Sequence, residues 1–216
     1  MIHALPPPVL TADERTALVR RGIVLSYVTI AYNSLEAMVS LVAGVLSGSV
    51  ALVGFGLDSV IEVTSSGAVQ WRLRSDANPA SRERIERRTL RIVGVCFLAL
   101  AGYVAGDSLH ALVQHEHPAR TVSGIIILSL SIVVMPLLAR RKRAVGVALG
   151  SRALSADATQ TSLCAWLSAI ALSGVLLNAV FGWWWADPAA ALLMTPIIAN
   201  EGVQAFRGEV ACDDCC

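Results

Sequence analysis

Two stretches without a single charged residue constrain this chain more than any other feature. Thr121–Ala139 carries no charge over 19 residues, and Ala158–Ala186 carries none over 29. A bilayer core of about 30 Å is crossed by about 20 helical residues. Only 15% of the residues are charged and 55% are hydrophobic, whereas soluble domains are about 25% charged. These patterns predict an integral membrane protein and exclude a disordered chain.

The apolar pattern predicts an all-α protein, a bundle of six transmembrane helices. Ser47-Gly48-Ser49 leaves room only for a tight turn between the first two. Thr11 and Glu14 have the spacing of a helix capping box. We expect a cytosolic N-terminal arm with a short helix at 1–20, the membrane domain at 21–207 and a short Cys-rich cytosolic tail at 208–216. The six predicted spans are 22–46, 49–71, 90–112, 121–139, 155–180 and 188–206.

Basic residues alternate between the predicted loops and indicate the orientation. They precede the first span, separate the second from the third, and follow the fourth and the sixth. The positive-inside rule then places both termini in the cytoplasm of a multi-pass protein of the cell membrane. A net charge of +1 gives no indication of a nucleic-acid partner. Arg20 and Arg21 precede the first span, Arg140, Arg141, Lys142 and Arg143 follow the fourth, and Arg207 follows the sixth.

Acidic residues inside the spans are the candidate functional groups. Asp58 and Glu62 lie four residues apart on one helical face, and Asn33 and Glu36 share a face of the first span. A charge at the membrane centre costs roughly 2.5–3.5 kcal/mol. We expect no Lys or Arg in the central part of any span, and therefore no internal ion pair. The carboxylates then bind a cation, face water or carry protons, unless the acidic pair is a structural one that bonds to Ser65, Ser66 or another helix.

The beginning of the fifth span offers a matching face. Asp157, Gln160, Thr161 and Cys164 follow one another at helical spacing and form one stripe. Two carboxylates with an amide oxygen and a thiol would make a four-ligand site, and mixed oxygen and sulfur ligands favour zinc or a neighbouring transition metal. Two neighbouring carboxylates also repel each other when both are charged, which suits a site that exchanges protons for a metal.

The segments GVLSGSVAL (44–52), GLDSVIE (56–62) and SADATQTSLC (155–164), followed by Trp185-Ala186-Asp187, resemble the cation diffusion facilitator family of divalent-metal/proton antiporters. The resemblance covers about residues 20–207. It implies a homodimer and a transport site with two ligands on each of helices two and five.

In that family, the paired ligands on each of these helices lie four residues apart. Asp58 and Glu62 fall on the helix-two positions. Gln160 falls on a family His and Cys164 on a family Asp; an alternative alignment places Asp157 at the Asp and Ala153 at the His. Asp157 and Glu36 would support the ligands or line the access path.

We therefore expect a secondary transporter and not an enzyme. It would export a divalent transition metal in exchange for protons, with zinc as the first candidate substrate. It needs the lipid bilayer, a metal substrate and no permanent cofactor. The tail residues Cys212, Cys215 and Cys216 would capture a soft metal or have no specific role. Two alternatives stay open: a membrane metal sensor or partner protein that does not transport, and a membrane thiol oxidoreductase.

Overall fold

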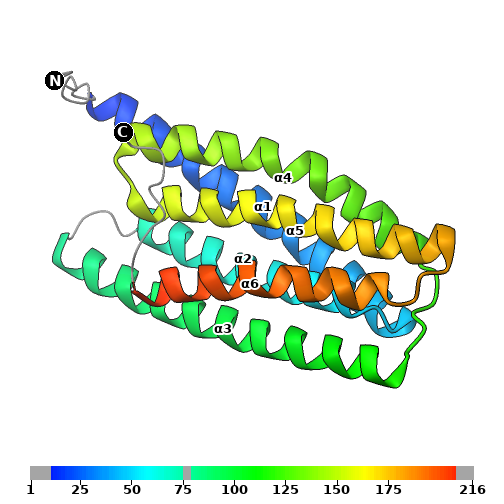
Figure 1. The fold of residues 1–216 in the computed structure, drawn as a ribbon. Helices are drawn as coiled ribbons and strands as arrows, with labels where there is room; N and C mark the ends of the chain where they lie inside the picture. Colours follow the sequence, from blue (N-terminus) through cyan, green and yellow to red (C-terminus); the bar gives the residue numbers. More distant parts are fainter. Residues whose placement is uncertain (1–10, 75–78, 208–216) are drawn as a thin grey trace, which may run out of the picture.

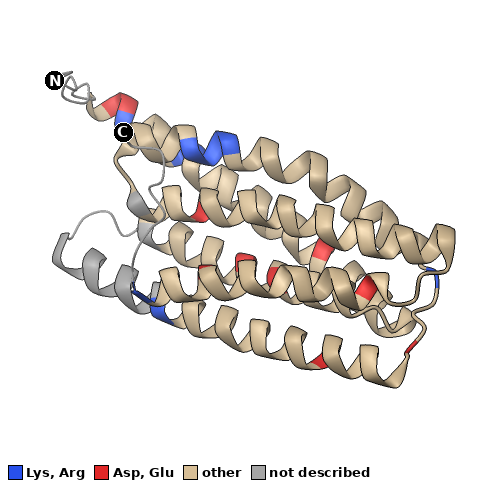
Figure 2. Cartoon of the chain, in the orientation of Figure 1, with Lys and Arg blue, Asp and Glu red and all other residues tan. Residues whose placement is uncertain are grey.

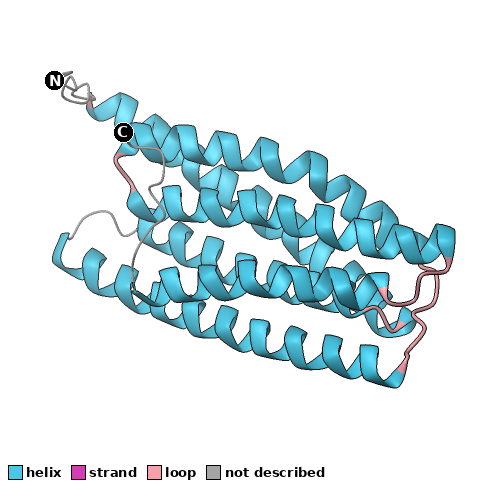
Figure 3. Ribbon diagram, viewed as in Figure 1, coloured by secondary structure: helices cyan, strands magenta, loops and turns pink. Residues whose placement is uncertain are grey.

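The computed structural model describes residues 11–74 and 79–207, and in this part of the chain the secondary structure is helical without strands (Figure 3). The helices pack side by side as one elongated bundle (Figure 1). The predicted all-α class is confirmed. The helices are α1 (Ala12–Ser47), α2 (Val50–Arg74), α3 (Pro79–Gln114), α4 (Val122–Leu149), α5 (Arg152–Phe181) and α6 (Ala186–Arg207).

Five of these helices are long and apolar enough to cross a membrane, namely α1 to α5. Each predicted apolar segment lies within one helix, apart from the first residue of the second and of the fourth segment, but most of the helices extend further at their ends. The helix expected in the N-terminal arm is continuous with α1, and α4 continues ten residues beyond the predicted end at 139. That α6 also crosses the membrane, and that both termini are cytoplasmic, stay predictions. The beginning of α1 and the end of α6 lie at the same end of the bundle (Figure 1).

The first helix begins and ends as its sequence predicts. The Thr11 side chain accepts a hydrogen bond from the Glu14 amide, and the Glu14 carboxylate accepts one from the Thr11 amide at 2.9 Å, which makes the capping box. At the other end, Gly48 has φ 70°, a left-handed conformation that favours glycine. A Cβ on Gly44 would lie 2.8 Å from the Val53 backbone nitrogen, so α1 and α2 form the expected tight hairpin.

The polarity of α1 is opposite to that of a helix in a soluble protein. The side that faces the bundle carries buried Ser26, Thr29, Asn33, Glu36 and Ser40, whereas from Val24 onward the large exposed residues are hydrophobic. Such a helix fits a lipid environment because hydrocarbon tails solvate its apolar side and neighbouring helices surround its polar side. Figure 2 likewise shows acidic residues along the length of the bundle, while most described Lys and Arg residues lie toward the end where α1 begins.

Two contacts hold the helices that surround the acidic residues. Asp187, at the beginning of α6, accepts a hydrogen bond of 2.5 Å from the Ser49 hydroxyl next to the beginning of α2. At the crossing of α3 with α6, a Cβ on Gly94 would lie 2.5 Å from the Phe206 nitrogen, so the two backbones are in direct contact. These contacts fix α2, α3 and α6 around one interior space.

Candidate functional site

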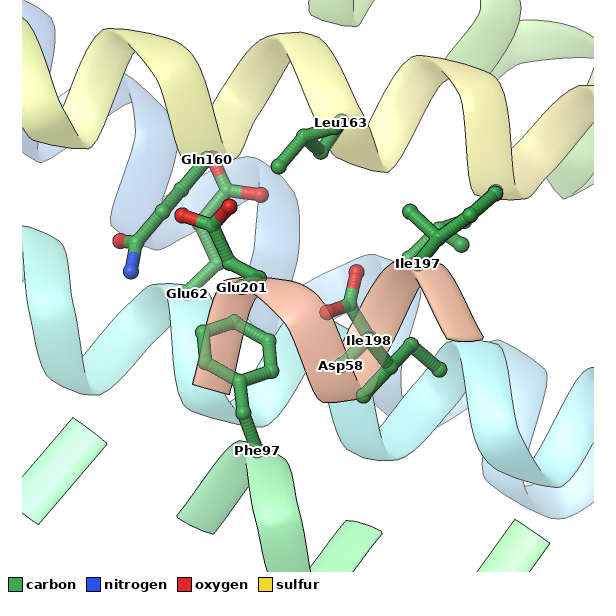
Figure 4. A pocket seen from close by; sticks show the side chains of 9 residues that line it. Asp58, Glu62, Phe97, Gln160, Leu163, Ile197, Ile198 and Glu201 are labelled. Carbon is green, nitrogen blue, oxygen red and sulfur yellow. The ribbon is translucent and has the colours of Figure 1, made fainter. Parts of the chain in front are cut away.

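Asp58 and Glu62 lie inside the bundle and line one small pocket. Their relative exposure is 4% and 3%, and they share the pocket with Gln160 of α5 and Glu201 of α6. Figure 4 shows Glu62, Gln160 and Glu201 gathered at one side of the pocket and Asp58 beside Ile198. The remaining lining residues are apolar, so water has little access to these groups. The other lining residues are Phe97, Leu163, Leu167 and Ile197.

Cys164 is buried, and its thiol lies next to a different carboxylate. The Sγ atom donates to Glu36 Oε2 at 3.8 Å, and the Ser59 hydroxyl donates to the same oxygen at 2.9 Å. Cys164 is also close enough to Asp58 and Glu62 to interact electrostatically with both. The structure therefore brings Glu36 of α1 to the predicted ligand on α5.

The other predicted residues of α5 are bound to serines of α2. Ser65 donates to Gln160 Oε1 at 2.6 Å, and Ser66 donates to Asp157 Oδ1 at 2.8 Å. These are the serines that a purely structural acidic pair would use, and here they bind α5 instead. Glu62 does bond to another helix, because Thr161 donates to its Oε1 at 2.5 Å.

The expectation that no internal ion pair forms was wrong. Lys142, assigned from the sequence to a basic loop after the fourth span, is completely buried. Its Nζ lies 2.8 Å from Asp157 Oδ2 and 3.8 Å from Glu62 Oε1. The physical reason is that α4 does not end at 139, so one of the four consecutive basic residues turns into the bundle. The carboxylates of Asp157 and Glu62 therefore have a protein cation beside them.

A pattern in the sequence could have identified Lys142. The buried residues of α4 include Leu128, Ser131, Met135, Leu138, Lys142 and Val145, at spacings of three and four. Lys142 continues this series, whereas Arg140, Arg141 and Arg143 fall outside it and are exposed. Extending the helical pattern beyond the last apolar residue would have placed Lys142 on the buried face.

Several buried polar atoms of α1 and α2 have no protein partner. They include Glu36 Oε1, Glu62 Oε2 and both terminal atoms of the Asn33 side chain. Buried polar groups are nearly always hydrogen-bonded, and exceptions indicate a water or an ion. Within the described residues, no three or more His, Cys, Asp and Glu side chains stand close enough to form a ready-made metal site. Cys212, Cys215 and Cys216 lie outside the described residues.

Five described helices are long and apolar enough to cross a bilayer, and carboxylates are buried among them. The chain is therefore a multi-pass membrane protein. Ionisable residues inside membrane spans typically mark ion pathways. The sequence model of the cation efflux transmembrane domain matches residues 26–211, and the chain belongs to that family. The resemblance seen in the sequence is confirmed.

Individual relatives are more distant. The chain is 29% identical over 169 residues to magnetosome protein MamB of Paramagnetospirillum magneticum, covering 76% of this chain and 57% of that protein. It is 28% identical over 188 residues to Transmembrane protein 163 of Xenopus laevis, covering 86% and 66%. It is 26% identical to an uncharacterized transporter of Methanocaldococcus jannaschii, covering 84% and 65%. The chain thus spans less than two thirds of the length of these relatives.

Proposed function

We propose that this chain carries a divalent transition-metal ion out of the cytoplasm in exchange for protons, with zinc as the preferred substrate. The observation that carries the proposal is the buried pair of carboxylates, Asp58 and Glu62, in a chain of the cation efflux family. A buried pair of like charges is costly unless a cation or protons neutralise it. A metal that enters the pocket supplies that neutralisation, and protons supply it when the metal has left.

The proposed ligand set spans two helices. Asp58 and Glu62 supply negative charge from α2, while the Gln160 oxygen and the Cys164 sulfur add donors from α5. Glu62 Oε2 has no protein partner and can coordinate without losing a hydrogen bond. Gln160 Oε1 already accepts from Ser65, and its second lone pair remains for a metal. Glu36 holds the Cys164 thiol, and Glu201 adds a carboxylate on the α6 side of the pocket.

Alternating access in this proposal moves the helices around the fixed ligands. A metal enters from the cytoplasm, replaces the protons on the carboxylates, and leaves on the other side when protons return. Two copies of the chain form the working unit in the cell membrane, with both termini in the cytoplasm. No resident cofactor takes part.

The experiment that tests this function is metal uptake by proteoliposomes. Zinc, cadmium, cobalt, manganese and iron(II) are offered separately to vesicles with an acidic lumen and to vesicles without a pH gradient. We expect one metal, zinc, to accumulate faster when the lumen is acidic. Uptake equal to that of protein-free vesicles for all five metals would contradict transport. Binding without uptake would instead support the membrane sensor, and uptake retained after replacement of the three tail cysteines would exclude the thiol oxidoreductase.

The part of Cys164 is tested by cobalt spectroscopy. Sulfur ligands bind cobalt(II) and zinc alike, and a cobalt–thiolate bond gives a charge-transfer absorption that oxygen ligands lack. Cys212, Cys215 and Cys216 are replaced by serine in every sample, because their thiols would give the same absorption. We expect this background protein with cobalt(II) to show the absorption and Cys164→Ser in the same background to lose it. Cys96→Ser is the matched control, because Cys96 is exposed on α3 and outside the pocket. An absorption that survives in Cys164→Ser would remove this residue from the ligand set.

A further inference from the structure

Lys142 is the one basic residue of its run that lies inside the bundle. Arg140, Arg141 and Arg143 are exposed beside it, whereas Lys142 has no exposed surface. Taking an ammonium group out of water costs several kcal/mol, so its partners decide whether it can be there.

Three oxygen atoms surround the Lys142 ammonium closely. Asp157 Oδ2 lies 2.8 Å from Nζ, and Nζ donates to Thr161 Oγ1 at 2.8 Å and to Ser66 Oγ at 3.3 Å. An ammonium has three N–H donors, so these three partners suffice to hold it. The Glu62 carboxylate is a fourth neighbour at the longer distance of 3.8 Å. Lys142 is thus anchored by Asp157 and can give up Glu62.

Glu62 is the carboxylate that Lys142 shares with the pocket. Its Oε1 receives the Thr161 hydrogen bond and faces the ammonium, while its Oε2 has no partner. Asp58, the other carboxylate on this side of α2, has no contact with Lys142. One acidic residue of the pair therefore has a protein cation beside it, and the other does not.

We propose that Lys142 is a tethered cation that competes with the transported metal for Glu62. This inference rests on the proposed function and adds a residue that sets the affinity of the site. With the site empty, the ammonium attracts Glu62 Oε1 and favours its charged form. When a metal binds between Asp58 and Glu62, it takes over this charge, and Lys142 stays held by Asp157, Thr161 and Ser66. The competition weakens binding and so speeds release of the metal.

The test measures zinc affinity and zinc uptake for the native chain and for variants in which methionine replaces Lys142. Methionine matches the length of the lysine stem without its charge. Lys142→Met alone leaves Asp157 buried and unpaired, which destabilises the fold, so the double variant Lys142→Met with Asp157→Asn is measured beside it. Arg143→Met, which removes a neighbouring exposed charge, is the matched control.

We expect the double variant to bind zinc about tenfold tighter than native protein, within the range common for coupled sites, as measured by titration calorimetry in detergent. In proteoliposomes, it should show a lower KM and a lower maximal rate, because release becomes slower. Arg143→Met should match native protein. A purely structural role of Lys142 predicts the opposite sign, since damage to the fold weakens binding.

Two results separate the possible failures. Native protein that transports zinc, together with a double variant of unchanged or weaker zinc affinity, would overturn the competition and leave the proposed function intact. Native protein that neither binds nor transports zinc would overturn both.

Discussion

Asparagine in place of Asp58 is expected to weaken zinc binding by at least about 100-fold. Loss of a residue that merely supports a metal ligand typically costs 10–100-fold, and Asp58 would be a ligand itself. Asparagine has the same shape, so the packing of the buried side chain between Ile198 and its other neighbours changes little. Titration calorimetry of the detergent-purified chain measures the dissociation constant directly.

Asp107→Asn is the control for this prediction. Asp107 lies on α3 and accepts a hydrogen bond at 3.3 Å from Tyr103 at the exposed surface, outside the pocket. We expect its zinc affinity to equal that of native protein. Equal affinities for native protein, Asp107→Asn and Asp58→Asn would show that Asp58 is not a ligand.

Valine in place of Gly94 is expected to disrupt the packing of α3 against α6. A Cβ there would lie 2.5 Å from the Phe206 nitrogen and 2.8 Å from the Gly202 oxygen, both of which are backbone atoms. Backbone cannot rotate away as a side chain can, so the helices must separate, at a cost on the order of 3 kcal/mol. Since these helices carry Phe97 and Glu201 of the pocket, metal uptake should fall together with the thermal unfolding temperature in detergent.

Gly102→Val is the matched variant for this measurement. Gly102 lies on the same helix, and a Cβ at this position has nothing within 4 Å. It should unfold at nearly the native temperature and transport at nearly the native rate. If Gly94→Val unfolded at the same temperature as Gly102→Val, the close contact of α3 with α6 would be refuted.

Features determined by local chemistry could be predicted from the sequence. Charge-free stretches such as Thr121–Ala139 lie in helices because only a helix satisfies its own backbone in lipid. The capping box at Thr11 and the turn at Gly48 follow from hydrogen bonding and backbone conformation within a few residues. The acidic pair of α2 was also visible, because its four-residue spacing and its apolar surroundings lie in one segment.

Features that depend on packing between distant segments could not be predicted in the same way. Lys142 stands in a run of four basic residues, and composition alone assigns that run to a loop. Its burial requires α4 to continue beside α5, where Asp157 forms an ion pair with it. The contact of Cys164 with Glu36 joins residues 128 positions apart, and the approach of Glu201 requires the whole arrangement of α6 against α2.

In the proposed function, the buried carboxylates form the transport site. The most direct test is zinc uptake into proteoliposomes with an acidic lumen, measured for native protein and for Asp58→Ala. Asp107→Ala, reconstituted at the same density, controls for the loss of an acidic residue elsewhere. We predict gradient-driven uptake by native protein and Asp107→Ala, and uptake by Asp58→Ala no faster than by empty vesicles. Uptake by Asp58→Ala at the native rate would contradict transport through this site.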